Sequence, residues 1–392
     1  MSGLPTPKSQ VLDFQRPEDG WDTSTLDEIK QVIRGDIIRD ILPVRPLNIY
    51  WGTATTGRPH AAYFLPAIKI AQFLQVGCKV KILLADLHGF LDADKAPEGV
   101  LESRAQYYER VIRALLRSVG VNLDNLEFVR GSSYQLSPAY SRDLLRLSKK
   151  VSVHNAVKAS SEIVKSMGEP VMADGIYPMM QLLDEEYLGA DAEFGGMDQR
   201  KAFALSHDTM AKVGFKVRAH LMNPMVPGLA GGKMSSSDPK SKIDLLDDAE
   251  TIRKKIAKAQ CPPRTTQGNG ILAFIQHVVL PYSELLSVDG KASINVVLKD
   301  HTEPSTLRSF AEVEAAYESD SLTPQLAKMI VQNVLVKLTE FIRRDFAADQ
   351  EWQEIAITAY PDASNSNEKK QDNPAKEKSK KNKGLVVPVV DQ

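Results

Sequence analysis

The chain has 392 residues, of which 43% are hydrophobic and 25% charged, and its formal net charge is −1. This length allows two or three domains with apolar cores, and the near-neutral charge argues against a protein that coats nucleic acid without specificity. No apolar run is long enough to span a bilayer, and residues 1–7 contain no basic, apolar leader. Two cysteines, Cys78 and Cys261, exclude a disulfide framework, so we expect a protein of the reducing cytosol.

The first part of the chain alternates between helical and strand patterns. Spacing of apolar residues predicts a helix over 24–42, a strand over 44–51, a helix over 61–76, a buried strand over 79–85 and a long helix over about 100–119. Strand, helix and strand at this spacing imply a parallel sheet with a right-handed crossover. In such sheets, ligands lie at the carboxyl ends of the strands.

The same pattern resumes after a helical interruption. We expect a strand over 126–129, helices through 137–168, a helix over 175–188, a strand over 191–194, a turn at 195–196, a helix over 199–213 and a strand over 220–226. The fold class is therefore α/β, with a Rossmann-like parallel sheet in residues 1–238 and a helical segment inserted at about 120–170.

The character of the sequence changes after residue 238. Residues 247–260, 268–280 and 324–346 have helical spacing, which predicts a separate, mostly α-helical domain over 239–360. Residues 361–392 are rich in Asn, Lys and Ser, so we expect a disordered tail.

The first candidate phosphate loop follows the strand that ends near Gly52. Three hydroxyls, backbone amides freed by glycine, and a helix that starts near a histidine suit the binding of phosphates; the residues are Gly52, Thr53, Thr55, Thr56, Gly57 and His60. A histidine that merely caps a helix is the alternative interpretation of His60.

A second candidate loop lies about 170 residues later. After two glycines it presents one ammonium group and three hydroxyls, in the sequence Lys233, Met234, Ser235, Ser236 and Ser237. Such a loop can hold a triphosphate while charge moves between its oxygens, a reaction catalysed mainly by positioning and electrostatics. Taken alone, the segment is equally consistent with a solvated serine-rich loop.

Polar residues form a stripe along one face of the helix predicted over 175–188. Tyr177, Gln181 and Asp184 are spaced i, i+4 and i+7, which places them on one face. The stripe could face solvent. However, Met179, Met180 and their apolar neighbours indicate a buried helix, in which these polar groups need partners.

The order of strand, histidine loop, helix and late lysine loop resembles the class I aminoacyl-tRNA synthetases. Two departures from the common signatures, His60-Ala61-Ala62-Tyr63 and Ser236, resemble the tyrosyl enzymes of eukaryotes and archaea, and the resemblance covers about residues 24–346. It implies a tyrosine–tRNA ligase that activates tyrosine with ATP and transfers it to the 3′-terminal adenosine of tRNA(Tyr). It also implies Mg²⁺ carried by the nucleotide, no protein-held metal, no membrane association, a homodimer formed through the insertion, and a cytoplasmic location. The basic stretch 253–258 adds a nuclear location as a second expectation, although it equally fits a solvated helix face.

The resemblance also assigns roles to individual residues. Tyr50 and Asp184 bind the phenolic hydroxyl of the substrate, Tyr177 and Gln181 its ammonium group, and Gln199 lies near its carboxyl group. The implied catalytic residues are His60, Lys233, Ser235 and Thr55. The implied ATP-binding residues are Gly52, Thr53, Thr56, Gly57, His60, Asp198, Lys233, Met234, Ser235, Ser236 and Ser237. Cys261 and Asp320 match positions that read the anticodon guanine, and His88 matches the pocket wall.

Three alternatives stay open at this point. A tryptophanyl-tRNA synthetase would need an indole pocket in place of the Tyr50 and Asp184 pair. An RNA-binding or scaffold protein that has lost catalysis would have no need of intact His60, Lys233 and Gln199. A simple nucleotidyltransferase would share the first loop but would be shorter and would lack the helical RNA domain.

Overall fold

The computed structural model of the protein describes residues 32–92, 95–164, 169–228 and 242–361. Its main sheet has six strands in the order β1-β6-β5-β2-β3-β4, and every neighbouring pair is parallel except β1 with β6. The strands are β1 Val32–Ile33, β2 Asn48–Ala54, β3 Lys79–Ala85, β4 Leu126–Arg130, β5 Ala192–Gly196 and β6 Ala219–Asn223. The predicted α/β class with a mostly parallel sheet is confirmed.

The strand order creates one reversal in the sheet. From β2 the chain moves outward through β3 to β4, then returns to the other side of β2 with β5 and β6. The carboxyl ends of β2 and β5 therefore flank a topological switch point, which is where open α/β sheets bind ligands.

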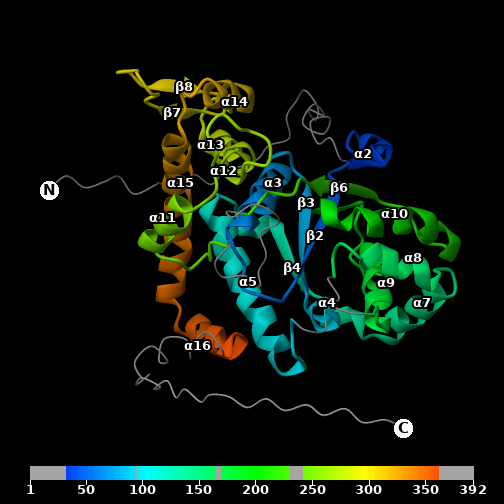
Figure 1. The fold of residues 1–392 in the computed structure, drawn as a ribbon. Coiled ribbons are helices and arrows are strands. Elements are labelled where there is room, and N and C mark those ends of the chain that lie inside the picture. Colours follow the sequence, from blue (N-terminus) through cyan, green and yellow to red (C-terminus); the bar gives the residue numbers. More distant parts are fainter. Residues whose placement is uncertain (1–31, 93–94, 165–168, 229–241, 362–392) are drawn as a thin grey trace, which may run out of the picture.

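Helices cover both faces of the sheet and fill the predicted insertion. They are α2 Gly35–Ile41, α3 Phe64–Gln75, α4 Asp86–Leu91, α5 Leu101–Ser118, α6 Ser132–Gln135, α7 Pro138–Ser148, α8 Val153–Ser160, α9 Met172–Tyr187 and α10 Arg200–Thr209. Figure 1 shows α7, α8, α9 and α10 gathered on one side of the sheet, with α11, α15 and α16 on the opposite side of the molecule.

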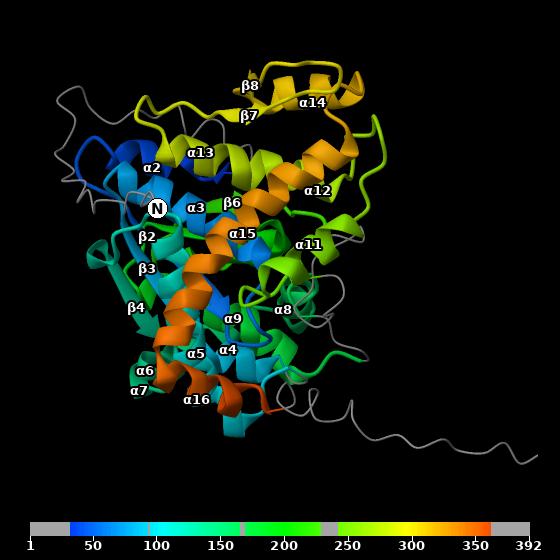
Figure 2. The same ribbon diagram turned by 90° about the vertical axis from the view of Figure 1, so that its left-hand side faces the viewer.

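The second part of the described chain is mostly helical. It consists of α11 Ala249–Ala257, α12 Gly270–Phe274, a π-helical turn Ile275–Val279, α13 Leu280–Leu286, the hairpin β7 Ile294–Val296 and β8 Ser305–Leu307, α14 Phe310–Glu318, α15 Pro324–Ala348 and α16 Gln350–Ala359. In Figure 2, α15 runs diagonally across the molecule over α5. Both α15 and α16 contact α5.

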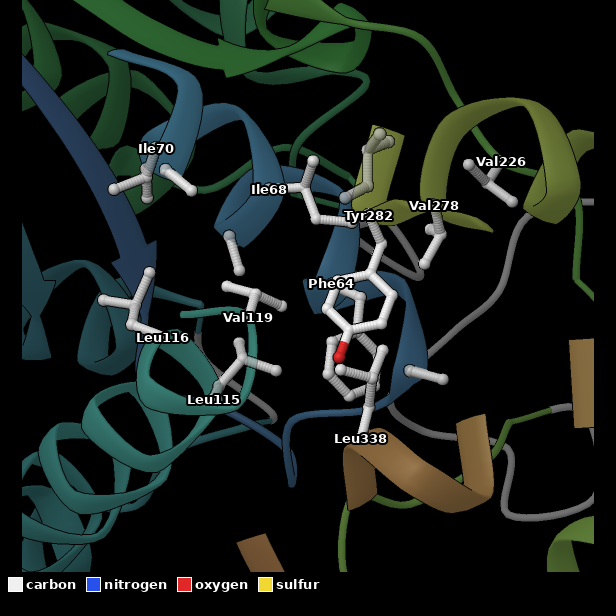
Figure 3. Close-up of a cluster of buried hydrophobic side chains, with 14 of the residues drawn as sticks. Phe64, Ile68, Ile70, Leu115, Leu116, Val119, Val226, Val278, Tyr282 and Leu338 are labelled. Atoms are coloured by element: carbon white, nitrogen blue, oxygen red, sulfur yellow. The ribbon is translucent and has the colours of Figure 1, made fainter. Parts of the chain in front are cut away.

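The apolar core is continuous between these two parts. Figure 3 shows Phe64 and Ile68 of α3 facing Val278, Tyr282 and Leu338 from the helical part. All five side chains are buried and belong to one hydrophobic cluster. The helical part therefore folds against the helices that cover the sheet, and burial of this shared apolar surface stabilises both.

Several predicted boundaries were wrong, for local reasons. The segment 32–33 forms β1 instead of part of a helix, because Arg34 takes a left-handed conformation with φ 57 and the helix starts only at Gly35. The strand after it begins at Asn48, two residues beyond Pro46, which has no backbone N–H to donate to a ladder. The predicted turn at 195–196 lies inside β5, where Gly195 and Gly196 pair with β6.

Candidate active site

Polar side chains from β2 and α9 meet at the switch point. Tyr50 is 1% exposed, and its hydroxyl lies 3.5 Å from the backbone oxygen of Gln181. Tyr177, Gln181 and Asp184 project from α9 and are all buried. The polar stripe on this helix therefore faces the interior, and the solvent-face alternative is excluded.

Asp184 is the most tightly held of these groups. Its carboxylate accepts hydrogen bonds from the Tyr134 hydroxyl at 2.8 Å, the Gln135 amide at 2.9 Å and the Tyr140 hydroxyl at 2.9 Å. Burial raises the pKa of Asp184 to about 7, against the opposing effect of these three donors. Because α6 and α7 supply all three donors, the insertion fixes the position of this carboxylate.

His88 lies beside two of these side chains. Its ring meets the Tyr177 ring edge-on at a centroid distance of 4.6 Å, and its Nε2 is 3.7 Å from Asp184 Oδ2. Burial lowers the pKa of His88 to about 4, so the imidazole is neutral at pH 7 and does not form an ion pair with Asp184.

Gln181 connects α9 to the end of β5. Its Nε2 donates to Glu193 Oε1 at 2.7 Å and to Gln199 Oε1 at 2.8 Å. Gly195 makes room for Gln199, since a Cβ at residue 195 would lie 2.5 Å from Gln199 Oε1. The adjacent Asp198 folds back in the same way over Gly196. The two glycines thus allow both polar side chains to lie against the strand end.

The end of β2 and the loop after it contain a second group of polar side chains. Thr53 Oγ1 and the Tyr63 hydroxyl are 3.0 Å apart, and the His60 ring meets Tyr63 edge-on at 5.4 Å. Gly52 lies against the side chain of Tyr50 on its own strand and that of Leu83 on the neighbouring strand β3. Thr53 and His60 therefore occupy one small cluster at the start of the helical segment that leads into α3.

Thr55 lies deeper than expected for a residue that contacts a ligand. It is fully buried, and its Oγ1 has no hydrogen-bond partner among the described residues. Gly89 of α4 packs directly over it, since a Cβ there would be 3.3 Å from the Thr55 hydroxyl. This hydroxyl can reach a ligand only if the loop or α4 shifts.

Two tyrosines hold the backbone of residues 56–58. The Tyr108 hydroxyl donates to the Gly57 carbonyl, and the Tyr360 hydroxyl donates to the Thr56 carbonyl at 3.3 Å. The Arg58 guanidinium lies 5.2 Å from the centre of the Tyr360 ring. The far end of the described chain therefore supports this loop.

Residues that flank the two candidate phosphate loops pair with each other. His60 forms an antiparallel bridge with Asp244, and the Ala61 amide donates to the Ile243 carbonyl at 2.8 Å. The second loop itself, with Lys233, Met234, Ser235, Ser236 and Ser237, lies outside the described residues. The segment that follows it nevertheless rejoins the fold beside His60.

Cys261 and Asp320 lie far from this pocket, around Tyr317 in the helical part. Cys261 Sγ is 3.1 Å from the Tyr317 hydroxyl. Asp320 follows α14 in a left-handed conformation with φ 65, and its carboxylate accepts from Lys299 Nζ at 2.9 Å. The lysine ammonium and this hydrogen bond lower the pKa of Asp320, which keeps it charged.

The sequence patterns missed several pocket residues. Tyr134 and Gln135 could have been found, because they closely follow β4 and the ends of parallel strands share one edge of the sheet. Glu193 also left a signal, as a charged residue inside a short buried strand needs a partner. Tyr140, in α7, left no comparable signal.

One buried group of side chains has the geometry that could hold a cation. Glu185, Glu193 and His220 each offer one ligand atom, and these atoms lie within 4.8 Å of one another. His220 Nε2 already lies 3.0 Å from Glu185 Oε1, so the same atoms also suit a hydrogen-bonded cluster.

Comparisons with known proteins point to one family. A family model described as tRNA synthetases class I (W and Y) matches residues 43–340. The chain is 46% identical over 367 residues to the cytoplasmic tyrosine–tRNA ligase of Saccharomyces cerevisiae, covering 92% of this chain and 91% of the yeast protein. It is also 46% identical over 338 residues to the enzyme of the same name from Danio rerio, but it spans 62% of that longer protein.

Similar solved structures come from the same family. The tyrosyl-tRNA synthetase of Archaeoglobus fulgidus in complex with L-tyrosine is similar with a TM-score of 0.73 and 28% identity, over 81% of this chain and 95% of that one. The Leishmania major tyrosyl-tRNA synthetase in complex with tyrosinol is similar with a TM-score of 0.74 and 26% identity, over 85% of this chain and 51% of that chain. A tryptophanyl-tRNA synthetase from Aeropyrum pernix, at 18% identity and a TM-score of 0.62, is similar in fold alone.

Proposed function

The chain belongs to the class I tRNA synthetases of the tryptophan and tyrosine group, and on this basis we propose that it is a tyrosine–tRNA ligase. It activates tyrosine with ATP to tyrosyl-adenylate and then transfers the tyrosyl group to the 3′-terminal adenosine of tRNA(Tyr). The observation that carries the proposal is the buried pair Tyr50 and Asp184 at the switch point, because a phenol-binding pocket needs polar groups at its closed end.

The substrate tyrosine enters this pocket with its ring first. Asp184 accepts the hydrogen bond of the substrate phenol, and Tyr50 contacts the same hydroxyl from β2. Three donors from the insertion already hold Asp184 in place. Phenylalanine would make no hydrogen bond with Tyr50 or Asp184, a form of discrimination for which tyrosyl-tRNA synthetases are the standard example. An indole side chain offers no hydroxyl in this position, which disfavours tryptophan.

The amino-acid backbone of the substrate lies toward the strand ends. Tyr177 and Gln181 bind its ammonium group, and Gln199 lies near its carboxylate. This orientation directs the carboxylate toward the loop of residues 53–60, where the α-phosphorus of ATP lies. The carboxylate oxygen attacks that phosphorus, and pyrophosphate leaves.

ATP is held between the two candidate phosphate loops, and Mg²⁺ arrives with it. Thr53, Thr56 and Gly57 line the first loop, and Asp198 binds the ribose. Negative charge grows on the phosphates during the attack. The helix start at His60 and the ammonium of Lys233 stabilise it electrostatically, which accelerates the reaction without a protein nucleophile. Ser235 contributes its hydroxyl to the second loop, and the buried Thr55 packs within the first.

The helical residues 239–360 form the tRNA-binding part in this proposal. Asp320 carries a charged carboxylate that can accept hydrogen bonds from a guanine base, and Cys261 lies beside the Tyr317 hydroxyl. Residues 1–238 form the catalytic part. The predicted tail, the Lys-rich residues 361–392, lies outside the described residues except for residue 361. The boundary at 238 marks a change in the sequence pattern and not a division of the core, since one apolar cluster contains residues from both parts.

A homodimer formed through the insertion is also part of the proposal. An open groove lies between α8 and the start of α9, lined by the apolar residues Val153, Val157, Pro170, Val171 and Met172. Val153 is 74% and Met172 75% exposed. Apolar groups gathered in this way on a surface are typical of protein–protein contacts, which supports pairing of two copies here.

The cytoplasm is the proposed location. The relatives carry the word cytoplasmic in their names, and none refers to the nucleus. None of the helices in the described ranges combines the length and hydrophobicity needed to cross a bilayer.

The proposal is tested by charging. The purified chain, incubated with ATP, Mg²⁺ and a tRNA(Tyr) transcript, should attach tyrosine and should leave tryptophan and phenylalanine free. Charging of a tRNA(Trp) transcript with tryptophan would instead move the chain to the sister group.

A further inference from the structure

A row of polar side chains crosses the sheet behind the tyrosine pocket. Strand register pairs Tyr50 of β2 with Glu193 of β5, and Glu193 with His220 of β6. Side chains of paired residues project to the same face of a sheet, so the three groups stand side by side. All three are buried, with Glu193 only 2% exposed.

This row continues into α9 and α10. His220 Nε2 lies 3.0 Å from Glu185 Oε1, and the Ser206 hydroxyl donates to Glu185 Oε2 at 3.1 Å. His207 Nε2 lies 3.2 Å from His220 Nδ1. Glu185 is therefore held from two sides, whereas Glu193 stands between this cluster and the pocket.

Glu193 contacts the pocket through Gln181. A glutamine side chain has two N–H hydrogens and one carbonyl oxygen. Both hydrogens of Gln181 are used, toward Glu193 Oε1 at 2.7 Å and Gln199 Oε1 at 2.8 Å. The Gln181 Oε1 atom thus remains for the substrate side, and it can accept hydrogen bonds but not donate them.

The orientation of the Gln181 amide determines whether it can bind an ammonium group. An ammonium group has donors and no acceptor, so it binds Gln181 Oε1 but not Gln181 Nε2. Gln199 cannot enforce the correct orientation, because its own amide could turn and present Nε2 instead. Glu193 carries no N–H group, so it is the neighbour that distinguishes the two orientations of Gln181.

Glu193 can play this part in its neutral form as well. Burial, with the nearby carboxylate of Glu185, raises the pKa of Glu193 well above its usual range. An oxygen of Glu185 lies within 4.8 Å of an oxygen of Glu193. Glu193 Oε1 accepts from Gln181, whereas Glu193 Oε2 has no hydrogen-bond partner among the described residues, so a proton on Oε2 leaves Oε1 as the acceptor for Gln181.

We infer that Glu193 is a positioning residue for tyrosine recognition: it fixes the Gln181 amide so that Oε1 receives the substrate ammonium group. This inference rests on the proposed function, since it takes the ammonium site at Gln181 as given. Glu193 does not touch the substrate in this account, and it acts through Gln181.

The test compares two ligands that differ in one group. Tyrosinol carries the ammonium group, and 3-(4-hydroxyphenyl)propan-1-ol lacks it. Dissociation constants for both are measured by calorimetry on the full chain and on the variants Glu193→Met and Glu193→Gln. We expect Glu193→Met to weaken tyrosinol by about tenfold or more, the scale of one lost hydrogen bond to a charged group, with a change of less than about twofold for the alcohol.

The conservative variant separates positioning from general damage. Glu193→Gln keeps an oxygen for Gln181 and gives Glu185 an N–H donor, so both ligands should bind within about threefold of the parent chain. Equal weakening of the two ligands by Glu193→Met would show a merely structural role and overturn the inference. If Glu193→Met does not fold, Glu193→Ala, which leaves room for water, takes its place in the same comparison.

Gln181→Met distinguishes failure of the inference from failure of the proposed function. If Gln181→Met weakens tyrosinol selectively and the Glu193 variants do not, the inference falls while the ammonium site stands. If no variant separates the ligands, the assignment of Gln181 itself fails. A stoichiometric metal ion found in the purified parent chain and lost in Glu193→Gln would also overturn the inference, because Glu193 would then be a metal ligand.

Discussion

The Tyr360 hydroxyl donates to the backbone oxygen of Thr56 across 3.3 Å, and so ties the segment after α16 to the loop that follows β2. The Tyr360 ring also lies 5.2 Å from the Arg58 guanidinium and 5.0 Å from that of Arg104. The end of the described chain therefore contributes to the shape of the proposed nucleotide loop. Because these residues are far apart in the sequence, no local sequence pattern predicts their contact.

Removing the Tyr360 ring should weaken ATP binding. Tyr360→Leu deletes one hydrogen bond and two cation–π contacts, so the 56–58 backbone loses a support and the KM for ATP should rise about threefold to tenfold. The KM for tyrosine should change by less than about twofold, because the tyrosine pocket lies on other elements. Pyrophosphate exchange kinetics measure both constants. Ile357→Ala, on an exposed part of α16, is the matched control, and an equal rise in both constants would contradict the prediction.

Asp184 should determine the choice between tyrosine and phenylalanine. Asp184→Ala removes the acceptor for the substrate phenol, so kcat/KM for tyrosine should fall by about tenfold to a hundredfold, while activation of phenylalanine should change much less. Exchange assays with both amino acids measure the ratio. Asp143→Ala is the control, because it removes another carboxylate that accepts a hydrogen bond from a tyrosine, Tyr187 of α9. An unchanged tyrosine-to-phenylalanine ratio in Asp184→Ala would refute the pocket assignment.

The same carboxyl group should make folding stability depend on pH. Its pKa is raised to about 7 in the folded protein, above the unfolded value near 4, so the folded state binds the proton more tightly. The stabilisation is fully present below the unfolded pKa and is lost as pH rises through about 7. The free energy of unfolding of the parent chain, minus that of Asp184→Asn, should therefore fall by about 1.4 kcal/mol per pH unit between about pH 5 and 6.5.

Urea unfolding without ligand measures this difference. Contributions from Glu193 and other buried groups are present in both proteins and largely cancel. A difference that stays constant over this range would show that the three donors keep Asp184 ionised throughout.

Asp320 should matter for tRNA and not for amino-acid activation. Asp320→Ala removes the proposed acceptor for the anticodon guanine, so kcat/KM for tRNA charging should fall by about tenfold, with pyrophosphate exchange unchanged. Glu318→Ala, an exposed carboxylate two residues away, is the control and should leave charging intact. Loss of charging in both variants, or loss of exchange in Asp320→Ala, would speak against a specific anticodon contact.

The sequence was a good guide to the sheet and a partial guide to the site. The buried strand 79–85 and the faces of α9 follow from local periodicity, and the structure has both as predicted. The short strands β1, β7 and β8 were not predicted, because two or three residues carry no period to recognise. The left-handed residue that ends β1 is Arg34 and not the adjacent Gly35, so the glycine does not mark the position of the change in direction.

The partners of the site residues were harder to predict than the residues themselves. Tyr134 and Tyr140 reach Asp184 from an insertion some forty to fifty positions earlier in the chain. Only the packing of α6 and α7 on α9 brings them together. Glu193 accepts a hydrogen bond from Gln181 where β5 and α9 meet, and no local sequence pattern predicts that contact.

The central claim is that the pocket at the switch point selects tyrosine for activation by ATP. ATP–pyrophosphate exchange, measured with each proteinogenic amino acid in turn, tests it most directly. We predict exchange with tyrosine alone. Exchange with tryptophan, or no exchange with any amino acid, would contradict the account.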